Sequence, residues 1–155
     1  YPPNIEGPAV AEYVTRKKAE AYLSELDDHD VLITGDTVVL LDNEVLGKPK
    51  SAEQARTMLD KLSNRTHTVA SGIAVTTKAE GICSAVDTCE VTFAKLDLDL
   101  IDHYIARYEP FDKAGGYGVQ DLIGFSGVTS LNGSYFTVMG LPTHLLFNLL
   151  NNLKS

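Results

Sequence analysis

Two long segments rich in β-branched residues constrain the fold of this chain more than any other feature. They are residues 66–77, "THTVASGIAVTT", and residues 81–96, "GICSAVDTCEVTFAKL". Val, Ile and Thr pack well on a pleated surface and are therefore enriched in strands. Because only a short turn separates the two segments, the sequence predicts a long hairpin.

Four other segments have the apolar periodicity of helices, at residues 8–26, 51–63, 97–108 and 143–153. In the first, one approximate face is formed by Val10, Tyr13, Val14, Lys17 and Ala21. The second begins with Ser51 and Gln54 at the spacing of a capping box. Its apolar stripe consists of Ala55, Met58, Leu59 and Leu62. The third begins with acidic residues, which suit the helix dipole.

Two further segments are predicted to contribute strands. Residues 31–41, "VLITGDTVVLL", have the pattern of a strand, a glycine and a second strand. Residues 123–142 predict one or two short strands, with a tight turn at Asn132 and Gly133. The whole chain, residues 1–155, is therefore expected to form a single α/β domain in which helices pack on a sheet.

The composition excludes several classes of partner. The net charge is −8 and the isoelectric point is near 4.8, which argues against non-specific nucleic-acid binding through a basic surface. No window approaches the roughly 20 apolar residues of a membrane helix, so we expect no membrane partner. Cys83 and Cys89 would lie about 20 Å apart on one strand, too far for a disulfide. Free thiols predict a reducing, cytoplasmic location.

Two short motifs carry chemistry that is weak when each is taken alone. In "TGDTVV", Asp36 and Thr37 follow a glycine in a strand, and a carboxylate there could hold Mg²⁺. The alternative is a hydrogen-bonded aspartate in a turn. In "GKP", Lys48 lies between a glycine and a proline, where it could meet a phosphate. The alternative is a solvated surface lysine, and the same holds for Lys17 and Lys18.

The segment "DKAGGYGVQ", residues 112–120, combines flexible backbone with polar side chains. It matches neither a dinucleotide fingerprint nor a phosphate-binding P-loop. Gln120 offers both a donor and an acceptor, as needed to read the edge of a base. A purely structural loop is an equal alternative, and Lys113 is expected to pair with Asp112 or Glu109 and to stabilise the loop.

The order of these motifs is more specific than any one of them. "RKKA", "GDTVV", "LGKP", "LDKLS", "THTV", "EPFDKAGGYGVQ" and "NGSYFTVMGLP" together resemble the Maf family of house-cleaning nucleotide pyrophosphatases. The resemblance extends from about residue 10 to the last helix. It implies an elongated mixed sheet with flanking helices and two lobes around a cleft, as in inosine triphosphate pyrophosphatases. It also implies hydrolysis of a nucleoside triphosphate to monophosphate and pyrophosphate with Mg²⁺ or Mn²⁺, and a possible homodimer.

The resemblance implies a role for individual residues. Lys18 and Lys48 resemble phosphate binders, and Asp36 resembles the catalytic carboxylate that holds metal or activates water. Thr37 and Gln120 occupy the positions that separate subfamilies. Here they resemble the branch that acts on dTTP and UTP, with modified pyrimidine nucleotides as further expected substrates.

One family feature is absent from the chain. The family begins with a strand and a Ser-x-Ser-Pro-Arg-Arg loop that binds phosphate, and this segment does not occur here. Glu6 is a candidate to replace an acidic residue that follows it. A non-catalytic nucleotide-binding or regulatory domain is therefore the alternative function.

Overall fold

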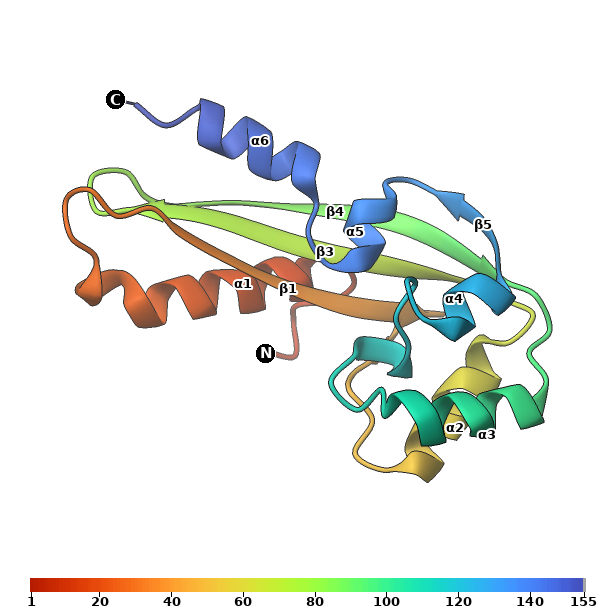
Figure 1. The fold of residues 1–155 in the computed structure, drawn as a ribbon. Coiled ribbons are helices and arrows are strands. Elements are labelled where there is room, and N and C mark those ends of the chain that lie inside the picture. The colour runs from red at the N-terminus through yellow and green to blue at the C-terminus, as the bar shows by residue number, and fades with distance from the viewer. Residues whose placement is uncertain (155) are drawn as a thin grey trace.

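The computed structural model describes residues 1–154, and its centre is an open sheet of five strands in the order β2-β1-β3-β4-β5. The strands are β1 (Leu32–Leu41), β2 (Glu44–Leu46), β3 (Thr66–Thr77), β4 (Gly81–Phe93) and β5 (Val128–Asn132). The predicted hairpin is confirmed as β3 and β4, which run in register from Thr66 opposite Thr92 to Thr77 opposite Gly81. Figure 1 shows that this hairpin extends along most of an elongated molecule.

The helices of the structure are α1 (Ala9–Tyr22), α2 (Ala52–Leu62), α3 (Leu98–Tyr108), α4 (Leu122–Gly127), α5 (Tyr135–Met139) and α6 (Thr143–Asn151). Short 3₁₀ turns occur at η1 (Leu23–Glu25) and η2 (Ala114–Gly116). The four predicted helices are thus confirmed, and the α/β class with them. Within the described residues, no helix is both long enough and apolar enough to span a membrane.

The strand pairing differs from the expected mixed sheet. Every pair in the described sheet is antiparallel. Neither of the two short connections, after β1 and after β3, is long enough for the crossover that parallel strands require. Gly35 does not divide β1 into two strands as predicted, because it continues the ladder opposite Ile73. Asp42 and Asn43 then form the turn to β2 with φ values of 48° and 70°.

The segment after the glycine-rich loop contains more helix than the sequence suggested. Only β5 is a strand, and α4 and α5 occupy positions predicted to be extended or turn. Ser134 caps α5 by accepting from the N–H of Phe136 at 3.2 Å, and Gly140 ends it with φ 103°. Short helices of this kind have little periodicity, so their caps are the only sequence signal.

The sheet separates two hydrophobic clusters. Side chains alternate between faces along a strand, so Val39 and Leu41 point away from Val38 and Leu40. The first pair belongs to the larger cluster, which contains α2 and α3. The second pair belongs to a smaller cluster with Val10 and Ala11 of α1. The helices therefore bury both faces of the sheet.

The buried face of α1 is not the predicted one. Its buried residues are Val10, Ala11, Thr15 and Ala19, whereas Lys17 and Ala21 are exposed. Small residues four positions apart let the helix lie close against the strands. This close approach was missed because small side chains give a weak hydrophobic signal.

The stripe of α2 agrees with the prediction, since all four of its residues are buried. The capping box is shifted by one residue at its second contact. Ser51 Oγ accepts from the N–H of Gln54 at 3.1 Å. The Gln54 side chain accepts from the N–H of Lys50 at 2.6 Å, instead of from Ser51.

Candidate active site

A cavity of about 510 Å³ lies on one face of β1 and brings together most of the predicted residues. Asp36, Thr37, Lys48 and Gln120 all line it. Residues far apart in the sequence thus surround one space. Lys18 does not line the cavity but bonds to Asp36, so all five predicted residues belong to one region.

The floor of the cavity is formed by alternate residues of two strands. Ile33, Thr37 and Val39 of β1 lie beside Val69 and Ile73 of β3. The walls come from residues 112–114, 117–118, 120 and 138–141. The floor is therefore mainly apolar, with the Thr37 hydroxyl as its polar group, and it suits a flat, uncharged ring.

Asp36 lies at the edge of this floor and is held by Lys18 of α1. The Lys18 ammonium donates to Asp36 Oδ1 at 2.7 Å and to the backbone carbonyl of Gly35 at 3.0 Å. The Asp36 side chain is 24% exposed, and Asp36 is one of the residues that line the cavity. Among residues 1–154, β1 has a neighbouring strand on the β2 side only from Val39 to Leu41, which leaves the edge at Asp36 open.

Two further lysines supply positive charge to the cavity. Lys48 is exposed in the connection between β2 and α2, and no hydrogen bond of its ammonium occurs within the described residues. Lys113 pairs with Asp112 at 3.1 Å, which confirms one of the two predicted partners. This pairing lowers the pKa of Asp112. Lys113 also lines the cavity, a position that the predicted structural role did not include.

The glycine-rich loop packs closely on the sheet. Gly115 has φ 70°, and a Cβ there would lie 3.1 Å from the Val39 side chain. Its N–H donates to the carbonyl of Gly47 at 3.1 Å, which joins this loop to the one that carries Lys48. A side chain at residue 115 would therefore displace the loop from the cavity floor.

Tyr117 fastens the same loop to the sheet through His67 of β3. His67 Nε2 and Tyr117 Oη lie 2.6 Å apart, and both residues pack edge-to-face against Phe93. Burial lowers the pKa of His67 to about 4, so the ring is neutral near pH 7. Burial also raises the pKa of Tyr117. The sequence did not single out this cluster, because a histidine in a strand has no distinctive spacing.

Tyr104 of α3 supports the end of the loop. Its hydroxyl accepts from the N–H of Gly118 at 3.2 Å and donates to Asp121 Oδ2 at 3.0 Å. Gln120 stands between these contacts and is exposed at the cavity rim. In the part of the chain that is described, its amide makes no side-chain hydrogen bond and remains available to a ligand.

Comparison with known proteins identifies the family of this chain. A family model described as "Maf-like protein" matches residues 2–153. The chain belongs to the Maf-like family. A dTTP/UTP pyrophosphatase of Phocaeicola vulgatus is 46% identical over 154 residues, which are 99% of this chain and 79% of the relative. One from Porphyromonas gingivalis strain W83 is 45% identical over 153 residues, covering 96% of this chain and 75% of the relative.

A more distant Maf-like relative has the same name. The dTTP/UTP pyrophosphatase of Flavobacterium psychrophilum is 41% identical over 152 residues, or 98% of this chain and 77% of the relative. This Maf-like chain therefore spans about three quarters of the length of these relatives. The predicted resemblance is confirmed over nearly all of its residues.

The side chains of this Maf-like site fit a divalent metal only if the substrate supplies part of the ligands. No group of three or more His, Cys, Asp or Glu side chains within residues 1–154 could hold an ion. Mg²⁺ is often bound through one or two carboxylates together with the phosphates of a substrate. Asp36 is half-buried at the cavity edge and fits such a site, in which the nucleotide supplies most of the oxygen ligands.

Proposed function

We propose that this chain hydrolyses nucleoside triphosphates, with dTTP and UTP as its substrates, to the monophosphate and pyrophosphate. The observation that supports this most is the placement of Asp36 at the edge of an uncharged floor, with Lys48 and Lys113 on the same cavity. A base fits the floor, and the phosphates fit the charged rim. The relatives named dTTP/UTP pyrophosphatase support the same choice of nucleotides.

The chemistry follows from this arrangement. Water attacks the α-phosphorus, a new P–O bond forms, and the bond to the bridging oxygen of pyrophosphate breaks. Asp36 takes the proton of the attacking water, a role that suits a carboxylate within reach of the substrate. The lysines stabilise negative charge that develops on the phosphate oxygens. Lys18 keeps the Asp36 carboxylate in position through the contact at 2.7 Å.

Mg²⁺ or Mn²⁺ is part of the proposal. Asp36 would hold the ion together with the triphosphate, and the ion would neutralise phosphate charge. A role in clearing modified pyrimidine nucleotides, a homodimer and a cytoplasmic location stay predictions, as does the single-domain organisation.

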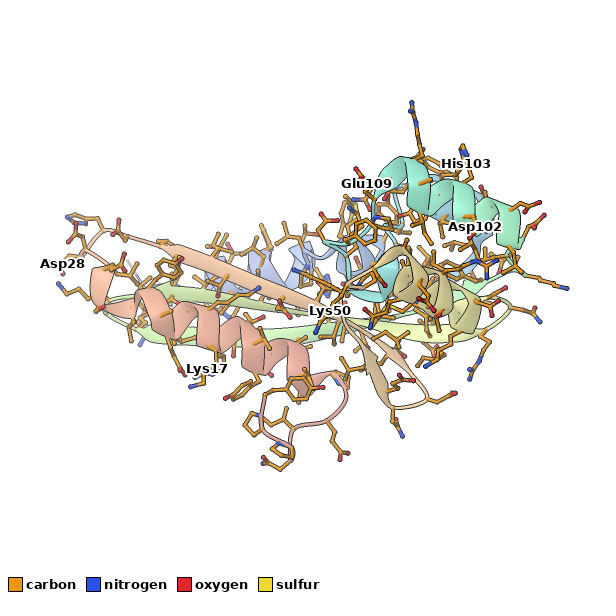
Figure 2. All side chains as sticks on the ribbon, turned by 90° about the horizontal axis from the view of Figure 1, so that it is seen from below. Lys17, Asp28, Lys50, Asp102, His103 and Glu109 are labelled. Carbon is orange, nitrogen blue, oxygen red and sulfur yellow. The ribbon has the colours of Figure 1, made fainter. Side chains whose placement is uncertain are left out.

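The proposal is tested by measuring pyrophosphate release from a panel of nucleoside triphosphates, with and without a chelator. We expect release from dTTP and UTP, loss of release on chelation, and a decrease in kcat of about 100-fold or more in Asp36→Asn. Asp102→Asn is the matched control, since Asp102 is also an ion-paired carboxylate, 2.7 Å from Arg56. Asp102 does not line the cavity. Figure 2 shows it on α3, at the end of the molecule opposite to Asp28.

Two results would contradict the proposal in different ways. Full activity of Asp36→Asn would remove Asp36 from the mechanism. Thermal stabilisation by nucleotides without any turnover would instead support the alternative of a nucleotide-binding domain.

A further inference from the structure

A row of polar side chains crosses three strands beneath the cavity. Thr37, Ser71 and Asp87 lie directly opposite one another in the register of β1, β3 and β4. Thr37 Oγ1 and Ser71 Oγ are 2.7 Å apart. Ser71 and Thr137 of α5 are fully buried. This row therefore joins the cavity floor, at Thr37, to α5.

The hydrogen bonds in the row have a defined direction. A hydroxyl group has one hydrogen to donate. Ser71 Oγ donates its hydrogen to the backbone carbonyl of Thr137 at 2.7 Å. Ser71 must therefore accept from Thr37, whose only hydroxyl hydrogen then points into the sheet.

The position of α5 is itself fastened, so this direction is maintained. Thr137 Oγ1 donates to Asp87 Oδ2 at 2.6 Å. The same Asp87 oxygen lies 3.4 Å from His144 Nε2. The Thr137 carbonyl that accepts the Ser71 hydrogen is thus held in place by the contact of α5 with β4. The Ser71 hydroxyl therefore keeps its hydrogen on this carbonyl and does not donate to Thr37.

The consequence for the cavity is that Thr37 offers it only lone pairs. Gly140, which follows α5, has no side chain to cover Thr37. A Cβ at residue 140 would lie 3.3 Å from Thr37 Oγ1. The hydroxyl oxygen is therefore accessible to a ligand, and it can accept a hydrogen bond but not donate one.

We propose that Ser71 is a positioning residue which makes Thr37 an acceptor for the ring N–H of a pyrimidine imide. Uracil and thymine carry a hydrogen on N3, whereas N3 of cytosine is a lone pair and would face the lone pairs of Thr37. Buried polar groups left without a partner are costly, so this contact discriminates between the bases. The inference rests on the proposed function and specifies how its substrates are selected.

The test compares kcat/KM for UTP and CTP in the protein and in Ser71→Ala. In this variant the Thr37 hydroxyl can rotate and donate to N3 of cytosine. We expect the ratio of UTP to CTP activity to fall about tenfold, with the CTP rate rising relative to the UTP rate. Thr76→Val is the matched control, because Thr76 is another fully buried hydroxyl on β3. Its ratio should be unchanged.

Thr37→Val provides a second measurement that does not depend on the folding of Ser71→Ala. It removes the acceptor while keeping the shape of the side chain, so the UTP rate should fall and the ratio should again decrease about tenfold. Equal losses on UTP and CTP in both variants would show that the row is only structural and would overturn the inference. Absence of pyrophosphate release from every nucleotide in the unaltered protein would instead refute the proposed function.

Discussion

At the scale of single residues, two neighbouring lysines of α1 have different partners because their side chains leave the helix in different directions. Lys17 pairs with Glu20 on the same helix at 2.6 Å and is 54% exposed. Lys18 reaches Asp36 on β1 at 2.7 Å. Figure 2 shows Lys17 on the outer surface of α1. Both lysines are paired, so ion pairing by itself does not favour Lys18 over Lys17 as the proposed functional residue.

The two lysines allow a test of Lys18 in which Lys17 is the control. We expect Lys18→Ala to lower kcat/KM for dTTP about tenfold or more, because a charged hydrogen bond to the proposed catalytic carboxylate, Asp36, is lost. Lys17→Ala should remain within about twofold of the unaltered protein, since its exposed pair contributes little. The check is steady-state pyrophosphate release. Equal effects of the two changes would argue against a role for Lys18.

At the scale of elements, the contact between α1 and the sheet depends on a missing side chain. A Cβ at Gly72 would lie 2.5 Å from Thr15 Oγ1 and 2.7 Å from the carbonyl oxygen of Ala11. The backbone of α1 could not remain where it is. Gly72 is also opposite Asp36 in the strand register. The packing of this helix and the position of the Lys18–Asp36 pair are therefore linked.

Gly72→Ala should consequently lower the free energy of unfolding by about 2 kcal/mol, within the range for an overpacked site. Gly47→Ala is the control, because a Cβ there would meet nothing within 4 Å. Urea unfolding measures both variants. An unchanged midpoint for Gly72→Ala would show that α1 shifts without cost.

At the scale of the whole molecule, the neutral His67 couples stability to pH. Its pKa falls from 6.5 to about 4 on folding, because burial disfavours the charged ring. Between these values the unfolded chain binds more protons than the folded one. Stability is therefore fully present above pH 6.5 and is lost as the pH falls toward 4. His67 also holds the glycine-rich loop to the sheet through its contact with Tyr117.

We expect the His67 contribution to the free energy of unfolding to decrease by about 2 kcal/mol between pH 7 and pH 5. Carboxylates contribute a slope of their own, so the informative quantity is the difference between the protein and His67→Gln. That variant should have a flatter dependence in this interval. His103→Gln, at an exposed position of α3, should keep the original slope. Identical slopes in all three proteins would contradict the assignment.

The long hairpin, the four longer helices and the membership of the family could be predicted from the amino-acid sequence. Local patterns suffice for the hairpin and the helices, since β-branched runs and a capped apolar stripe act within one element. The family was indicated by the order of the motifs along the chain. The buried face of α1 and the short helices α4 and α5 could not be predicted in this way. They depend on small residues and caps, whose effect appears only against a neighbour.

For the candidate site as well, some features could be predicted from the sequence and others only from the tertiary structure. Sequence alone identified Lys18, Asp36, Thr37, Lys48 and Gln120 as the polar residues of interest, because their order along the chain is distinctive. Tertiary structure alone decided that four of them share one cavity and that Lys18 joins them through its contact with Asp36. It also decided that the Thr37 hydrogen points to Ser71. The direction of a hydrogen bond depends on partners brought together from distant segments, and no local pattern carries that information.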